Sequence, residues 1–496
     1  MLLEAEALAS YPAERDIAAH EVAERVALSG RVLVVLDDDP TGTQSVADLP
    51  VLTAWETEDF RWAFGCRIDG ARPAAVYVLT NTRSLDPSEA AQRNRQVVVA
   101  ASRAAQEEGI RLAFVSRSDS TLRGHFPLET DVLAEAIAAH GGAAVDGVVI
   151  VPAFPDAGRV TIGGHHYVRT TAGGGGGPAG SPEASLTPVS ETEFAKDATF
   201  GFSSSYLPAY VEEKTSGRRS AGDVIVLDLA TIRAGAGAIA DAIGPAADST
   251  PIVVDTTGEN DLRALALGLE EAEGRGKHLL YRVGPPFVRG RIGQDVREPL
   301  TAEEVYGRVP GGARTDLAPG GLIVVGSHVG LTTRQLARLR EGHASARTIE
   351  IDVNRLLDPG TAPFHLDATV AAVIDSLASG DVIIHTSRAL VKTGNPAESL
   401  QIARTVSAAV VSVVNRTLKA TPPRFVIAKG GITSSDVAAH GLEIRHAIVR
   451  GPMLPGIVSL WEPVSGPARG IPYVVFAGNV GDDESLAQVT KTLSAF

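Results

Sequence analysis

Residues 31–42 predict a strand that is followed directly by an acidic turn. They read Arg31-Val32-Leu33-Val34-Val35-Leu36-Asp37-Asp38-Asp39-Pro40-Thr41-Gly42. The nearly all-apolar run 31–36 is typical of a strand that is buried on both faces of a parallel sheet. Ligands of open α/β sheets bind beyond the carboxyl ends of the strands. We therefore expect one or two of the three acids to face a ligand hydroxyl or a metal. The alternative is a solvated turn shaped by the Pro-Thr-Gly sequence.

The same alternation of apolar runs and helical patterns continues along the chain. Further strands are predicted at 74–80, 111–116, 146–151, 223–228 and 251–255. A long helix is predicted after Asp86, which can cap it, with Pro87 at the first helical position and Glu89 completing a capping box. Alternating strands and helices indicate a mostly parallel sheet covered by helices.

A shift of composition near 305–320 divides the chain, and the alternation then restarts. The predicted strands are 321–325, 347–351, 381–385, 424–428, 446–450 and 472–476, and the predicted helices are 331–341, 366–379, 396–419 and 433–441. The fold class predicted is α/β with two domains, each a mostly parallel sheet flanked by helices. Their expected limits are 29–305 and 306–496, after a helical extension over 1–28.

Composition excludes several classes of protein. The 496 residues include 45 Lys+Arg and 59 Asp+Glu, a net charge of −14 that disfavours nonspecific nucleic-acid binding. A single cysteine, Cys66, allows neither an intramolecular disulfide nor a multi-thiolate metal site. Acids stand where a signal peptide would carry Lys or Arg, and no run of about 18 apolar residues is present. We expect a cytoplasmic protein without membrane or nucleic-acid partners; the sequence leaves open whether it forms a homo-oligomer.

A second polar motif follows the strand predicted at 111–116. It contains Arg117, Ser118, Asp119, Arg123 and Gly124. Arginine forks bind carboxylates or phosphates, and Asp accepts hydrogen bonds from hydroxyls. Together with the acids at 37–39, this motif suits a small polyhydroxylated acid; the alternative is an Arg–Asp ion pair that only holds a loop.

Glycine turns between a strand and a helix occur twice in the second half. Residues 427–437 contain Lys429-Gly430-Gly431-Ile432-Thr433, and residues 325–333 contain Gly326-Ser327. Such turns let phosphate oxygens approach backbone amides at a helix start, and Thr433 is predicted to cap the helix with Asp436 three residues on. Neither turn fits the Walker consensus. The glycine run 173–177 is read as a loop, because no apolar strand leads into it.

Two adjacent histidines, His165 and His166, would face opposite ways on a strand. They are therefore interpreted as structural or substrate-flanking residues and not as a shared metal site.

Taken together, the motifs resemble those of the four-carbon acid sugar kinase family, over about residues 31–490. The signature pieces are 37–42, 117–124, 191–197 (Glu-Thr-Glu-Phe-Ala-Lys-Asp) and 429–436. The resemblance implies an N-terminal domain for the sugar acid and a C-terminal domain for ATP. It implies sugar-site residues Asp37, Asp38, Asp39, Thr41, Arg117, Ser118, Asp119 and Arg123. It implies nucleotide contacts at Gly326, Ser327, Lys429, Gly430, Gly431, Thr433, Gly478 and Asn479.

The function expected from the resemblance is phosphorylation of a hydroxyl of threonate, erythronate or a related oxo-acid, with ATP and Mg²⁺. Asp38 or Asp119 would orient or deprotonate the hydroxyl, and the metal ligands stay open. Two alternatives remain. Asp37-x-Asp39-x-Thr41 also fits a haloacid-dehalogenase-like phosphatase with Asp37 as nucleophile, and a non-catalytic sugar-acid-binding protein would need the same front half.

Overall fold

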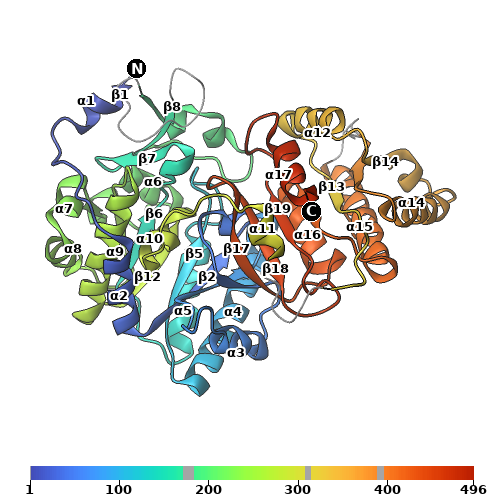
Figure 1. The fold of residues 1–496 in the computed structure, drawn as a ribbon. Helices are drawn as coiled ribbons and strands as arrows, with labels where there is room; N and C mark the ends of the chain where they lie inside the picture. The colour runs from blue at the N-terminus through green and yellow to red at the C-terminus, as the bar shows by residue number, and fades with distance from the viewer. Residues whose placement is uncertain (1, 171–183, 308–313, 388–395, 496) are drawn as a thin grey trace. The chain divides into compact units, whose positions relative to one another are not determined.

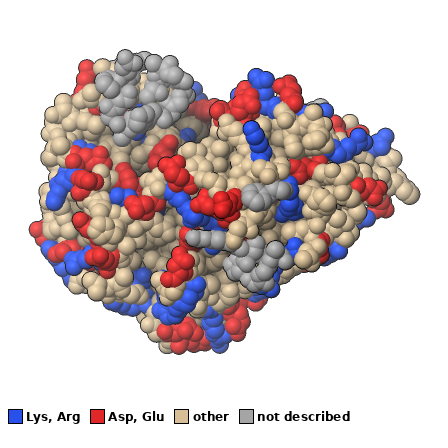
Figure 2. Space-filling view, viewed as in Figure 1, with Lys and Arg blue, Asp and Glu red and all other residues tan. Residues whose placement is uncertain are grey.

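The computed structural model describes residues 2–170, 184–307, 314–387 and 396–495. The chain forms two compact units (Figure 1). Unit 1 comprises Met1–Pro50 and Ala54–Val296, and unit 2 comprises Val51–Thr53 and Arg297–Phe496. The glycine run 173–177 and the pair Gly311-Gly312 lie outside the described residues. Acidic and basic side chains are interspersed over the face drawn in Figure 2.

Unit 1 is built on a parallel sheet. Its strand order is β10 (Ile225–Leu227), β11 (Thr250–Val254), β6 (Gly147–Val151), β12 (Leu279–Val283), β5 (Arg111–Arg117), β2 (Arg31–Asp37) and β4 (Ala75–Leu79). Every one of these neighbouring pairs is parallel. The strands predicted in this half are confirmed, whereas β12 was not predicted. The short strand β3 (Leu49–Leu52) crosses the division, and Thr53, which follows it, donates its backbone N–H to Arg445 in unit 2.

Helices connect these strands in two packed groups. One group contains α3 (Thr57–Gly65), α4 (Pro87–Glu108) and α5 (Leu128–Ala139). The other contains α2 (Ala19–Ser29), α7 (Leu229–Ala234), α8 (Ala236–Ile243), α9 (Glu259–Gly274) and α10 (Pro286–Ile292). Asp86 caps α4 as predicted, accepting from the amides of Ser88 and Glu89. The Glu89 side chain accepts from Arg93 at 2.8 Å, so it does not complete the expected capping box.

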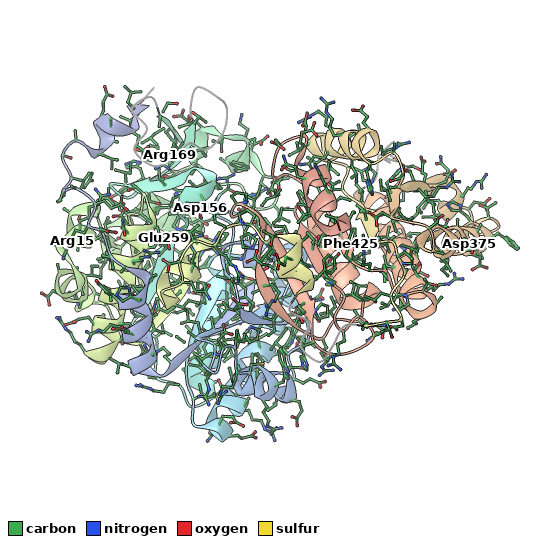
Figure 3. The ribbon with its side chains drawn as sticks, in the orientation of Figure 1. Arg15, Asp156, Arg169, Glu259, Asp375 and Phe425 are labelled. Atoms are coloured by element: carbon green, nitrogen blue, oxygen red, sulfur yellow. The ribbon has the colours of Figure 1, made fainter. Side chains whose placement is uncertain are left out.

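A small antiparallel sheet also belongs to unit 1 and was not predicted. Its order is β1 (Leu2–Leu3), β9 (Ser185–Pro188), β8 (His165–Thr170) and β7 (Arg159–Ile162). The expected helical extension over 1–28 is therefore only partly helical, with α1 (Glu4–Leu8) and α2 separated by residues 9–18 and β1 paired to β9. Buried Arg169 of β8, labelled in Figure 3, forms an ion pair with buried Glu4. This ion pair holds the N-terminal segment on the small sheet.

Unit 2 contains a second, mostly parallel sheet. Strands β14 (Arg347–Ile351), β15 (Val382–Thr386), β13 (Leu322–Val325), β16 (Val426–Lys429) and β19 (Tyr473–Phe476) are parallel in that order. Antiparallel strands β18 (Val458–Pro463) and β17 (His446–Leu454) follow β19. All the strands predicted in this half are confirmed, and β18 is additional.

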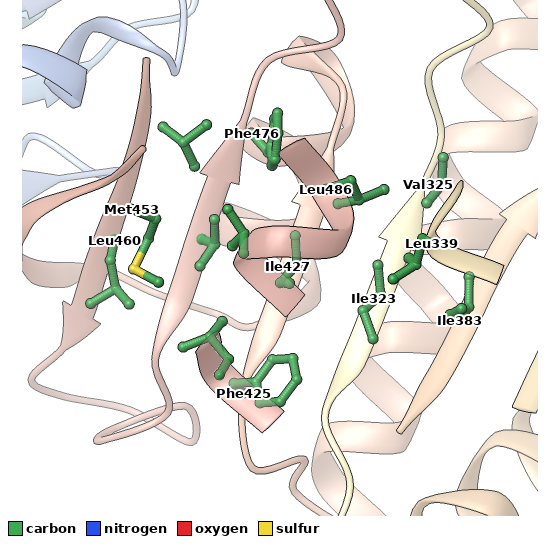
Figure 4. Close-up of a cluster of buried hydrophobic side chains, with 14 of the residues drawn as sticks. Ile323, Val325, Leu339, Ile383, Phe425, Ile427, Met453, Leu460, Phe476 and Leu486 are labelled. Atoms are coloured by element: carbon green, nitrogen blue, oxygen red, sulfur yellow. The ribbon is translucent and has the colours of Figure 1, made fainter. Parts of the chain in front are cut away.

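The helices of unit 2 enclose an aliphatic core. They are α11 (Ala302–Tyr306), α12 (Gly330–Gly342), α13 (Val353–Leu357), α14 (Ala362–Leu377), α15 (Pro396–Ala420), α16 (Gly431–Asp436) and α17 (Ser485–Ser494), with a π-helical turn over Val437–Gly441 after α16. Ile323 and Ile427 from neighbouring strands, Leu339 from α12 and Leu486 from α17 are buried together, as Figure 4 shows. The predicted α/β class is confirmed. None of the helices among the described residues combines the length and apolarity needed to span a bilayer.

Candidate functional site

Each sheet has a point at which neighbouring strands send their connections in opposite directions. In unit 1 the chain leaves β2 toward β4 and leaves β5 toward β6, on the other side. In unit 2 the chain leaves β13 toward β14 and leaves β16 toward β19. Such switch points open a crevice at the carboxyl ends of the two strands. The acidic and arginine motifs of the sequence lie at the first point, and the glycine turns lie at the second.

Asp37 and Arg117 form a buried ion pair across the carboxyl ends of β2 and β5. Both residues are about 2% exposed, and the Arg117 Nε donates to Asp37 Oδ1 at 2.5 Å. Burial raises the pKa of Asp37 to about 7, against the opposing effect of Arg117. A Cβ on Gly42 would lie 2.2 Å from the Asp37 carboxylate, so only glycine lets this turn close over it.

Asp38 is equally buried and forms an ion pair with a second arginine, Arg83, in the turn that follows β4. Arg83 donates to Asp38 through Nε at 3.1 Å and through Nη2 at 2.6 Å. Asp39 accepts from the amide and hydroxyl of Thr41, at 3.0 and 2.6 Å. Burial would raise the pKa of Asp39, but Arg83, Arg117 and Thr41 outweigh it and lower that pKa. Arg117 also lies 3.4 Å from Asp38, and Arg83 lies 3.5 Å from Asp39, so two arginines together offset the mutual repulsion of the three acids.

Asp119 organises the loop after β5. It accepts from the Thr121 amide at 3.2 Å and from the Arg123 Nε at 2.6 Å. Burial opposes ionisation of Asp119, but Arg83 and Arg123 outweigh it and hold its pKa well below the ordinary value. Arg123 also lies 3.7 Å from Asp197, so the segment 191–197 reaches the same loop. The predicted residues of both front-half motifs are thus brought together; Ser118 is buried among them, with its amide bonded to the Val283 carbonyl.

His166 supports this loop from the small antiparallel sheet. Its Nε2 lies 2.7 Å from the Ser120 carbonyl and its Nδ1 lies 2.9 Å from the Thr161 hydroxyl. The ring is fully buried, and burial lowers its pKa to about 4. His165 is exposed and contacts Tyr206, with ring centroids 4.8 Å apart and the ring planes tilted by 36°. The two histidines do face opposite ways, as predicted.

In unit 2 the glycine turns pack against one another. The amides of Gly326 and Ser327 donate to the Lys429 carbonyl at 3.2 and 3.3 Å, and the Gly430 amide donates to the Phe476 carbonyl at 2.8 Å. Thr332 donates to the carbonyl of Gly478, which precedes exposed Asn479 in the turn after β19. The expected nucleotide residues therefore converge at the switch point of unit 2.

One expectation about this turn is wrong. Thr433 does not cap the helix, because α16 already begins at Gly431 and its N-cap residue is Gly430; Asp436 instead accepts from Ser407. The Thr433 side chain fills the space beside Gly326, where a Cβ would lie 2.2 Å from its hydroxyl. The glycine at 326 therefore serves packing between turns.

Lys429 does not present its charge at the turn. Its side chain is fully buried, its Nζ donates to the Ala477 carbonyl at 2.6 Å, and it lies 3.8 Å from the Phe476 ring centroid. Burial lowers the pKa of Lys429 to about 7. The Lys429 ammonium group therefore connects β16 to the turn after β19. In this conformation it cannot make the expected contact with a phosphate.

Comparison with known proteins assigns both halves. A family model described as a sugar-binding N-terminal domain matches residues 33–291, more than half of the 496 residues, and one described as a nucleotide-binding C-terminal domain matches residues 322–486. The chain belongs to the four-carbon acid sugar kinase family. The resemblance drawn from the motifs is thereby confirmed.

Three known proteins are similar to this chain along most of its length. A D-erythronate kinase of Heliobacterium modesticaldum is 26% identical over 356 residues, covering 71% of this chain and 70% of that protein. A Salmonella typhimurium LT2 structure, named a putative tRNA synthase, has a TM-score of 0.63 at 19% identity and covers 92% of this chain and 98% of its own. A Haemophilus influenzae DUF1537 structure has a TM-score of 0.59 at 18% identity, covering 93% and 100%. These two structures show a shared fold alone.

Two residues of the carboxylate–arginine cluster of unit 1 were missed in the sequence. Arg83 stands alone in a polar turn, and only the parallel pairing of β2 with β4 brings it to Asp38. Arg282, at the end of the unpredicted β12, is buried over the Phe126 ring at 4.9 Å and donates to the Arg123 carbonyl at 3.4 Å. Neither has a local signal that separates it from an ordinary loop arginine.

Proposed function

We propose that the protein is an ATP-dependent kinase that phosphorylates a hydroxyl of a four-carbon sugar acid such as erythronate or threonate. Membership of the family supports the reaction class, and the D-erythronate kinase relative supports the substrate class. The observation that carries the proposal is the carboxylate–arginine cluster at the switch point of the sugar-binding domain. Carboxylates accept hydroxyl hydrogen bonds there, and arginines bind acids.

Within this cluster, the solvent exposure of each carboxylate side chain indicates whether it can contact a substrate. The side chains of Asp37 and Asp38 are each 2% exposed, whereas those of Asp119 and Asp39 are 12% and 25% exposed. Asp119 and Asp39 are therefore assigned to the sugar hydroxyls. Asp38, with both of its oxygens on Arg83, is a positioning residue and not the base.

The transfer itself needs little help from a base. The substrate hydroxyl oxygen bonds to the γ-phosphorus, the bond to the β,γ-bridging oxygen of ATP breaks, and ADP leaves. Positioning and neutralisation of charge dominate such reactions. Asp119, kept ionised by Arg83 and Arg123, accepts the hydrogen bond of the hydroxyl and then its proton as the phosphate ester forms.

Nucleotide binding is assigned to the turns of unit 2. Helices α12 and α16 begin just after these turns, and the backbone N–H groups of a first helical turn suit phosphate oxygens. Among the described residues, no group of three His, Cys, Asp or Glu side chains is arranged to hold a metal. Mg²⁺ is commonly held by substrate phosphates with one or two carboxylates, so we assign it to the nucleotide without naming protein ligands.

The phosphatase alternative needs Asp37 as an exposed nucleophile. Its carboxylate is buried beneath the Gly42 turn and bound by Arg117. An attack on a phosphate ester by this oxygen would require breaking that ion pair and opening the turn. The kinase is therefore the function the geometry supports best.

The test is ADP release in a coupled assay with a panel of four-carbon acids, each with and without ATP. The proposal expects ADP only when a suitable acid is present, together with an equal amount of phosphorylated acid by mass spectrometry. Phosphate released from sugar phosphates without ATP would support the phosphatase. Acid binding without any ADP would support the non-catalytic protein.

A further inference from the structure

Two arginines of unit 1 share one aromatic ring. The guanidinium carbon of Arg123 lies 5.3 Å from the Phe194 ring centroid, and that of Arg159, at the start of β7, lies 5.9 Å from it. Phe194 belongs to the short turn Glu193–Lys196, and all three residues are partly exposed. Cations pack favourably on an aromatic face, so the ring holds both groups in place.

The charge of Arg159 is not neutralised by an ion pair. Its Nη1 donates to the Ala157 carbonyl at 2.9 Å, while its Nε is buried without a hydrogen-bond partner among the residues that the structure describes. Over the same residues, no carboxylate lies within ion-pair distance of Arg159. Burial lowers its pKa and neighbouring Arg123 lowers it further, against the attraction of Asp119. Two guanidinium groups thus lie near Asp119, and within the described part of the chain only Arg123 has a further carboxylate, Asp197, at 3.7 Å.

Three other arginines near this end of the sheet, Arg83, Arg117 and Arg289, are already bound to carboxylates. Arg117 is bound to Asp37 and Arg83 to Asp38. Arg289 donates to Glu259 at 2.5 Å and to Asp156 at 3.0 Å, two acids labelled close together in Figure 3. Arg282 makes no ion pair among the described residues and its Nη1 has no hydrogen-bond partner there, but it is only 4% exposed and lies over the Phe126 ring, so it offers a ligand little surface. Arg117, which the sequence suggested for the substrate carboxylate, has no free face for it.

We infer that Arg159 and Arg123, held by Phe194, form the subsite that binds the carboxylate of the sugar acid. The inference rests on the proposed function and assigns its acid specificity to a residue outside the recognised motifs. A planar guanidinium pairs with a planar carboxylate through two parallel hydrogen bonds. The hydroxyls of the bound acid then extend toward Asp119, which already contacts Arg123.

The test compares an acid with its neutral isostere. D-erythronate and D-erythronamide carry the same hydroxyls, and their dissociation constants are measured by calorimetry without nucleotide. The wild-type protein is expected to prefer the acid by at least tenfold. Arg159→Gln is expected to lower that preference by about ten- to a hundredfold, the usual effect of losing a charge-assisted hydrogen bond. Binding of the amide should be unchanged.

Two further variants make the result decisive. Arg103→Gln removes an arginine whose side chain is 71% exposed on α4 and should leave the preference intact. Arg159→Lys keeps the positive charge and should retain part of the preference for the acid over the amide. The preference can therefore still be measured in this variant if Arg159→Gln does not fold.

Three outcomes would overturn the inference. A wild-type preference in Arg159→Gln and Arg159→Lys would place the carboxylate elsewhere and leave the kinase proposal intact. Equal weakening of acid and amide would make Arg159 a structural residue. A wild-type protein that binds neither ligand would contradict the proposed function as well, so the two failures are distinguishable.

Discussion

Single residues of the proposed sugar-acid site differ in how fully their charges are already paired. Asp37 and Asp38 are buried and bonded to Arg117 and Arg83, whereas the side chain of Asp119 stays 12% exposed beside Arg123. Removing one partner of a buried pair leaves the other charge uncompensated, which costs several kcal/mol. Variants of the buried acids therefore report on folding, and variants of Asp119 report on chemistry.

Replacement of Asp119 by asparagine tests its role as the group that receives the proton. Asp119→Asn should lower kcat by about a hundredfold or more, because the amide accepts a hydrogen bond but no proton. The KM for ATP should stay unchanged in steady-state kinetics. Asp131→Asn, on α5 with its side chain 38% exposed, is the matched control. A kcat within threefold of the wild type would remove Asp119 from the reaction.

His166 predicts a specific pH dependence of stability. Because burial lowers its folded-state pKa from 6.5 to about 4, the unfolded chain takes up the proton first as the pH falls. Its stabilising contribution is therefore present above pH 6.5 and is lost between about pH 6.5 and 4. A shift of this size corresponds to about 3 kcal/mol.

The measurement is the free energy of unfolding by denaturant at pH 7.5 and at pH 4. In the wild type this free energy falls between pH 7.5 and pH 4. In His166→Gln the fall should be about 3 kcal/mol smaller, because glutamine does not titrate. His20→Gln, at an exposed position of α2, should keep the full difference. An unchanged difference in His166→Gln would show that His166 is not the titrating group.

At the scale of elements, the close packing of three turns explains why unit 2 has glycine at positions 326, 430 and 478. Thr433 from α16 fills the space beside Gly326, and Ser327 from the turn after β13 lies close to both Gly430 and Gly478. The turns after β13, β16 and β19 can approach one another only because these positions lack side chains. The glycine pattern thus builds the turn cluster, whose helix starts are then available to a nucleotide.

Substitution of Gly326 tests this packing. A Cβ there would lie 2.2 Å from the Thr433 hydroxyl and 3.1 Å from its Cβ, so rotation of the side chain gives no full relief. Gly326→Ala should lower the free energy of unfolding by about 1–3 kcal/mol, as overpacking does. Adding Thr433→Ala should restore part of it. Gly342→Ala, with no atom within 4 Å, should cost nothing, and equal losses at 326 and 342 would contradict the account.

The same scale explains what could be predicted from the sequence. Continuous apolar runs identified β2, β5, β13 and β16, and the motifs that follow them form the two sites. Strand β12 was not predicted, because Arg282 interrupts its apolar run. The strands of the small sheet were not predicted either, because they are too short for a clear hydrophobic periodicity. Arg159 was missed with them, and Phe194 was quoted only as part of the 191–197 motif without a role, because pairing between distant segments, and not local sequence, brings both to the loop at Asp119.

Across the whole molecule, both units place their ligand residues at a switch point of a mostly parallel sheet. Fold class and the ends of the main strands follow from local patterns, but the partner of each charge does not. Asp38, for example, was expected to act on substrate, and its partner Arg83 comes from another strand end. Assignment of one ligand to each unit is the central claim.

Hydrogen exchange with each ligand alone tests this claim most directly. A four-carbon acid that the kinase assay identifies should slow amide exchange at 37–42 and 117–124, and a non-hydrolysable ATP analogue should slow it at 326–333 and 430–436. Protection of 37–42 by the nucleotide, with 326–333 and 430–436 unchanged, would contradict the account.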